Sequence, residues 1–76
     1  MTNIELFTKR FKELRKSKFK SQRKASEKLG YSQFLICNWE TGKTLPSFLT
    51  LIELANYFNV SADYLLGLSD KKEREK

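Results

Sequence analysis

Apolar residues recur along the first part of the chain at spacings of three and four, which is the period of a helix buried on one side. These positions are Ile4, Phe7, Phe11 and Leu14, and charged residues fill most of the gaps between them. The pattern predicts an amphipathic helix with one buried stripe. We expect it to end near residues 16 to 18, where lysines suit the negative end of the helix dipole.

Serine and glycine residues mark the ends of two shorter helices that follow. Serine is a favoured N-cap, and glycine readily takes the left-handed conformation that ends many helices. The sequence therefore predicts two short helices joined by a tight turn. The pairs are Ser21 and Gly30 around residues 22 to 29, and Ser32 and Gly42 around residues 33 to 41.

Two further helices are expected after a loop that ends at Pro46. Ser47 begins the fourth, which extends to about residue 58 with an apolar face of Leu51, Leu54, Ala55 and Phe58. Ser61 caps a fifth helix that runs through Leu66 and ends at Gly67, with Asp63 well placed in its first turn. No segment alternates with period two for long enough to predict a strand, so the fold class is all-α.

Charge is distributed unevenly between the two halves of the chain. The whole sequence has 15 Lys and Arg against 9 Asp and Glu. Residues 9 to 43 hold eleven basic and three acidic residues, whereas residues 44 to 70 hold no basic and three acidic ones. Such a footprint suggests a polyanionic partner for the first half. Taken alone, it is equally compatible with lysines and arginines that only keep helices soluble.

The residue types exclude several kinds of chemistry. The chain has one cysteine, Cys37, and no histidine, so neither an intrachain disulfide nor a zinc site of the usual Cys/His type is expected. No nucleophile with a matching base and no phosphate-binding loop is visible, so we expect no enzyme, no cofactor and no metal. The absence of a signal peptide and of a membrane-spanning apolar run predicts a cytoplasmic protein without membrane contact.

The segment from about residue 22 to residue 41 has the features of a helix-turn-helix. The small residue Ser26 lies where the two helices must cross closely, Gly30 permits the sharp turn, and Ile36 and Trp39 point to the core. The N-terminal end of the second of these helices is then left exposed. A major groove about 12 Å wide admits such a helix, which contacts bases while the first helix crosses the backbone.

This segment and the residues after it resemble the helix-turn-helix domain of phage repressors and Cro proteins, the XRE-type family of transcriptional regulators. The resemblance covers about residues 8 to 68. It implies a compact five-helix, lambda-repressor-like domain over residues 1–69. From their charged residues, we expect residues 70–76 to be a tail that is disordered or starts a linker. The matching positions are Gln22, Leu29-Gly30, Ser32, Ile36, Glu40, Gly42-Lys43, Pro46-Ser47, Leu51, Leu54-Ala55 and Val60-Ser61 before Leu65-Leu66.

The resemblance also implies a function, which is sequence-specific binding of double-stranded DNA by a bacterial or phage regulator, most often a repressor. Gln33 takes the base-reading position, because a Gln amide can bond adenine N6 and N7 together. Phe34 follows it and could pack on a thymine methyl, cap the edge of the core or contact a partner protein. Asn38 is expected to face outward and to contact a base or a phosphate. Gln33 as a solvated surface residue is the plainer alternative.

Phosphate contacts are expected on both sides of the reading helix. Gln22 is placed at the N-terminus of the second helix, where backbone N–H groups favour an anion. Lys20 and Arg23 add positive charge beside it and are further candidates for phosphate contact. The resemblance implies that Lys43 and Thr44 form a second phosphate-binding site. The family also often pairs an arginine at the end of the first helix with a glutamate at the end of the third. We therefore expect a structural ion pair between Arg15 and Glu40.

The fifth helix and its flanks are the expected contact surface of a homodimer, through Tyr64, Leu65, Leu66 and Leu68. A dimer of this kind would bind a near-palindromic operator and be associated with the nucleoid. The alternative is a protein-interaction module that retains the fold, such as an antitoxin or a regulatory subunit, with Phe34 and Leu35 as its apolar patch. The concentration of basic residues between 9 and 43 favours the DNA interpretation.

Overall fold

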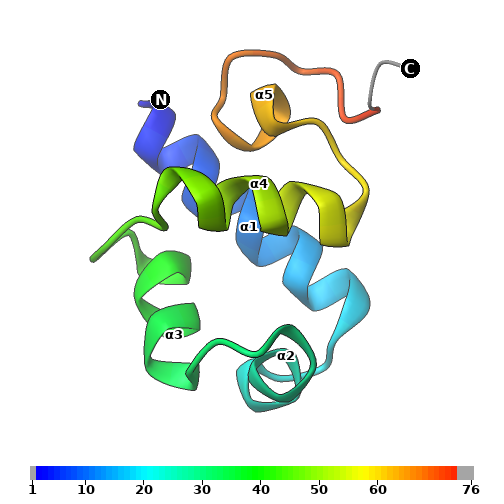
Figure 1. The fold of residues 1–76 in the computed structure, drawn as a ribbon. Helices are drawn as coiled ribbons and strands as arrows, with labels where there is room; N and C mark the ends of the chain where they lie inside the picture. Colours follow the sequence, from blue (N-terminus) through cyan, green and yellow to red (C-terminus); the bar gives the residue numbers. More distant parts are fainter. Residues whose placement is uncertain (1, 74–76) are drawn as a thin grey trace.

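A computed structural model shows five helices, and it describes residues 2–73 (Figure 1). Within that range there is no strand, which confirms the predicted all-α class. No helix there is long and apolar enough to cross a membrane. α2 and α3 lie together at one end, and α5 with the C-terminal segment lies at the other. The helices are α1 Asn3–Lys18, α2 Gln22–Leu29, α3 Gln33–Thr41, α4 Phe48–Phe58 and α5 Ala62–Leu65.

Side-chain caps fix where these helices begin. In α2, α3, α4 and α5 the preceding serine accepts a hydrogen bond from the backbone N–H three residues later. Thr2 forms a reciprocal capping box with Glu5 at the start of α1. Gly30 and Gly42 end α2 and α3 with φ of 83° and 77°, the left-handed conformation expected of them. α5 is one residue shorter than predicted, with Leu66 as its C-cap.

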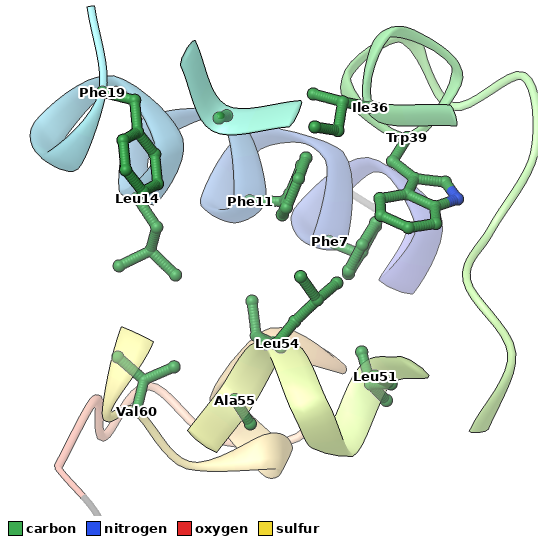
Figure 2. Packing of buried hydrophobic residues seen from close by; sticks show 12 residues of the cluster. Phe7, Phe11, Leu14, Phe19, Ile36, Trp39, Leu51, Leu54, Ala55 and Val60 are labelled. Atoms are coloured by element: carbon green, nitrogen blue, oxygen red, sulfur yellow. The ribbon is translucent and has the colours of Figure 1, made fainter. Parts of the chain in front are cut away.

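Aromatic and aliphatic side chains from all five helices and the connections between them form one core. Phe11 is fully buried at its centre, and its ring makes edge contacts with Trp39 of α3 and Phe58 of α4, at centroid distances of 5.8 and 6.2 Å. Leu54 of α4 points toward α1 from the other side (Figure 2). Burial of such side chains stabilises the fold by about 1.5–3 kcal/mol each before entropy is subtracted.

Two sequence expectations about burial in α1 and α5 are wrong. Ile4 belongs by spacing to the buried stripe of α1, yet it is 50% exposed, because it stands in the first turn at the mouth of a small apolar cavity. Leu65 was expected at a dimer surface, but it is fully buried in the core. A one-turn helix must bury its apolar side somewhere, and Leu65 is the residue of α5 that does so.

The segment after α5 lies back against the body of the domain. The guanidinium of Arg10 donates to the backbone carbonyls of Tyr64 and Ser69 and to the carboxylate of Asp70. Ser61 bonds the backbone carbonyls of residues 71 and 72 through its hydroxyl and its N–H. The predicted disorder of residues 70–76 stays a prediction, and residues 74–76 lie outside the described residues.

Candidate nucleic-acid interface

The turn between α2 and α3 is held by a contact within the motif. The hydroxyl of Ser26 donates a 2.6 Å hydrogen bond to the carbonyl of Tyr31, so the small residue at the helix crossing also closes the turn. Gly30 takes its left-handed conformation with open space around it. Ser32 then caps α3 by accepting the N–H of Leu35. These contacts set the direction in which α3 leaves the turn.

α3 divides into a buried and an exposed side, as expected. Ile36 and Trp39 are 0% and 3% exposed, and they attach the helix to the core. Gln33 is exposed in the first turn, and Phe34 beside it is 74% exposed. A polar amide and an aromatic ring are therefore both presented to solvent at the N-terminal end of α3. This is the end that a helix-turn-helix directs into a groove.

Asn38 is not on that exposed side, which corrects the expectation that it faces outward. Only 7% of it is exposed, and it is flanked by other buried residues of α3. Five residues along a helix amount to a rotation of about 140° at 3.6 residues per turn. That rotation separates Asn38 from Gln33 around the helix, and its low exposure leaves little of the side chain available to a base.

A buried charge network joins the three helices of this region. The ion pair expected between Arg15 and Glu40 is present, with Nε–Oε2 at 2.6 Å and a second contact from Nη2 to Oε1 at 3.0 Å. These side chains are 7% and 2% exposed. The hydrogen bond that Arg15 donates to Glu40 raises the pKa of Arg15 above its usual range, outweighing the opposite effect of burial. The guanidinium therefore keeps its charge inside the domain.

Gln22 is the third member of this network, which the sequence did not predict. Its side-chain amide donates to Oε1 of Glu40 at 3.2 Å. The first residue of α2 is thereby linked through Glu40 to both α3 and α1. An amide has two N–H donors and a carbonyl, so this contact leaves Gln22 able to bond a phosphate while it is held in place. No feature of sequence spacing marks this contact.

The remaining candidates for phosphate contact are exposed. Lys20, Lys43 and Thr44 lie on the surface of the connections before α2 and after α3. Arg23 is 82% exposed on its side chain and has only a loose pair with Glu27, at 3.7 Å. Because such a surface pair is weak, Arg23 is available to an anion. Residues 2–73 contain no cluster of three or more side chains suited to hold a metal ion.

Tyr31 provides a second link that sequence reasoning missed. Its ring packs edge-on against Trp39 at 5.3 Å, and its hydroxyl donates to Oε2 of Glu53 on α4 at 2.8 Å. Burial, with the hydrogen bond to Glu53 as the next cause, raises the pKa of Tyr31 above 10.0. The turn of the motif is thus tied to α4 as well as to its own helices. An aromatic residue after Gly30 was the only sequence signal for it.

Comparison with known proteins places this sequence in a family. Residues 8–71 match the family model described as a helix-turn-helix domain. The chain is 38% identical over 66 residues to the HTH-type transcriptional regulator ImmR of Bacillus subtilis (strain 168), covering 87% of this chain and 52% of that protein. It is 37% identical over 68 residues to an uncharacterized HTH-type transcriptional regulator of the same organism, YqaE, covering 88% and 59%.

A third relative is the SPbeta prophage-derived uncharacterized HTH-type transcriptional regulator YonR of the same organism. It is 38% identical over 61 residues, covering 80% of this chain and 56% of YonR. This chain thus spans just over half the length of these relatives. No solved structure gives a significant match. The family match covers most of the chain, including both helices of the motif, and the chain therefore belongs to the helix-turn-helix domain family.

Proposed function

We propose that this domain binds double-stranded DNA with α3 in the major groove, as part of a transcriptional regulator. Gln33 and Phe34 contact base edges, the amide of Gln33 by paired hydrogen bonds and the ring of Phe34 by packing on a thymine methyl. Gln22, Lys20 and Arg23 contact the phosphates on one side of the groove, and Lys43 and Thr44 those on the other. Asn38 has no part in base reading.

The observation that carries the proposal is the position of exposed groups around α3. Gln33 and Phe34 stand on the solvent side of a helix whose opposite side is fixed by Ile36 and Trp39. The connections that precede α2 and follow α3 carry exposed lysines. A helix with base-reading groups between two cationic segments has the arrangement by which this motif binds duplex DNA.

The finer parts of the proposal concern the whole regulator. We propose a repressor of bacterial or phage origin that acts in the cytoplasm at the nucleoid. It binds as a homodimer through the region of the fifth helix, with Leu66 and Leu68 as the exposed apolar contacts and Tyr64 beside them. A dimer would recognise two half-sites about one helical turn, ~34 Å, apart.

Binding to a random duplex pool, followed by selection of the bound sequences, tests this function. Fluorescence anisotropy should show affinity that falls steeply with salt, and selection should enrich an inverted repeat. Gln33→Ala should then weaken binding to the selected site by about 1–3 kcal/mol, with little effect on scrambled DNA. Asn56→Ala, an exposed change on α4, is the matched control. Equal losses on both DNAs would contradict base reading by Gln33.

A protein-interaction module remains the second candidate because of one observation. Phe34 is 74% and Leu35 37% exposed on α3, where a DNA reader often has polar residues. If the domain fails to bind any duplex at low salt, this candidate replaces the first. Phe34→Ser would then be the variant to compare in binding to protein partners.

A further inference from the structure

α1 separates its basic residues into two groups by burial. Arg10 and Arg15 are 9% and 6% exposed. Arg10 makes an ion pair with Asp70, and Arg15 makes one with Glu40. Lys9, Lys12 and Lys16 are exposed. The arginines therefore serve the fold, and the lysines are not needed for that purpose.

The three lysines share one face of α1, because their spacings of three and four bring them into a row. Within residues 2–73 every ion pair uses an arginine, so none of the three has a carboxylate within 4.0 Å. The nearest acids on the helix are Glu5 and Glu13. Glu5 accepts hydrogen bonds from Thr2 in the capping box, and Glu13 makes no ion pair with any of the three lysines.

Two of the three lysines, Lys9 and Lys12, lie beside the end of α3. Lys9 and Lys12 line a surface groove whose opposite wall is the end of α3 at Thr41 and Gly42. Lys43 and Thr44, the proposed phosphate-binding site, come directly after these two residues. Two acids, Glu5 and Glu40, also line the groove. Glu40 is paired with Arg15, and Glu5 accepts hydrogen bonds from Thr2 in the capping box. The lysines of α1 therefore continue the cationic surface of the motif, with three positive charges against the two exposed acids of the helix, Glu5 and Glu13.

We propose that Lys9, Lys12 and Lys16, here called the α1 lysine row, bind DNA phosphates that flank those held by Lys43 and Thr44. This inference rests on the proposed DNA binding and extends its contact surface to α1. Lysine ammonium groups on flexible stems suit this role, since they act as point charges and make no base-specific contacts. Each phosphate neutralised should add about 0.9 to the slope of log affinity against log salt.

The test compares two triple variants that remove the same charge. The first is Lys9→Gln, Lys12→Gln and Lys16→Gln. The control is Lys18→Gln, Lys71→Gln and Lys72→Gln. Lys18 lies over the ring of Tyr57, and the other two belong to the C-terminal segment, at the far end from α2 and α3. Anisotropy titrations of all three proteins across salt, on the selected site and on scrambled duplex, give the slopes. Thermal melting confirms that each variant is folded.

Loss of the α1 lysine row should lower the magnitude of the slope by up to about 2.7, at about 0.9 for each phosphate. The control should lower it by less than about one such step. The ratio of affinities for selected and scrambled DNA should stay the same, because phosphate contacts do not read sequence. Equal slopes for the two variants, with normal binding by the wild type, would overturn this inference alone. Absence of wild-type binding would overturn the proposed function as well.

Discussion

The Glu40 carboxylate on α3 connects the three helices of this region, because it accepts hydrogen bonds from Arg15 of α1 and Gln22 of α2. Glu40→Gln leaves the Arg15 guanidinium buried without a counter-charge, so we expect a loss of about 3–5 kcal/mol in the free energy of unfolding. Urea denaturation measures it. Glu27→Gln, which removes the exposed pair with Arg23, is the control and should cost less than about 1 kcal/mol. Similar small losses in both variants would contradict a structural role for Glu40.

Tyr31 makes folding stability depend on pH in the alkaline range. Its pKa is raised above 10.0 in the folded domain, so the unfolded chain loses the proton first as pH rises. The contribution of the hydroxyl is therefore fully present below pH 10 and is lost as pH rises through the folded pKa. The difference in unfolding free energy between wild type and Tyr31→Phe should be constant from pH 7 to 9 and shift against the wild type above pH 10. Parallel pH profiles through pH 11 would refute this.

Individual side chains were the least predictable features. Spacing predicted that Asn38 faces solvent and that Ile4 is buried, and both predictions are wrong. The helical period gives the direction of a side chain, but it does not say how much of that side the rest of the domain covers. The contacts of Gln22 with Glu40 and of Tyr31 with Glu53 join positions 18 and 22 residues apart. Such contacts follow from tertiary packing, which the sequence pattern does not contain. The pair of Arg15 and Glu40 was reached only through the resemblance to a family.

At the scale of elements, the helices were predictable to within about one residue because their ends carry local signals. Serines accept backbone N–H groups at the starts of four helices, and glycines in the left-handed conformation end α2 and α3. Each signal acts within four residues, so no tertiary knowledge is required. The exposed side of α3 at Gln33 and Phe34 followed from the same period, once Ile36 and Trp39 were assigned to the core.

The C-cap of α2 gives an element-scale prediction. A Cβ added at Gly30 would meet no atom within 4 Å, so Gly30→Ala is disfavoured only by its φ of 83°. We expect a loss of about 1–2 kcal/mol in unfolding free energy. Gly30→Asn should lose less, because asparagine tolerates the left-handed region. Thermal melts show which of the two variants is less stable. Equal destabilisation would show that the left-handed backbone conformation is not what favours glycine at this cap.

For the whole molecule, charge and apolar surface are segregated. Residues 44 to 70 contain no basic residue, and this half includes α4, α5 and several exposed apolar side chains. Two copies of a chain with net charge +6 repel each other least through such a surface. A contact between copies through the region of α5 also keeps α2 and α3, at the other end of the domain, free for DNA (Figure 1).

The proposed dimer therefore yields a prediction about assembly. Leu66→Asp with Leu68→Asp places two charges on side chains that are 37% and 69% exposed, so the fold should tolerate them while a self-contact does not. Sedimentation should show a monomer for this variant and a concentration-dependent dimer for the wild type. Binding to DNA with two half-sites should fall toward that for a single half-site, because the gain from two linked contacts is lost. Leu49→Asp, on a residue of α4 that is 70% exposed, is the control. If Leu49→Asp dissociates the dimer and the double variant does not, the copies meet through α4 rather than through the region of α5.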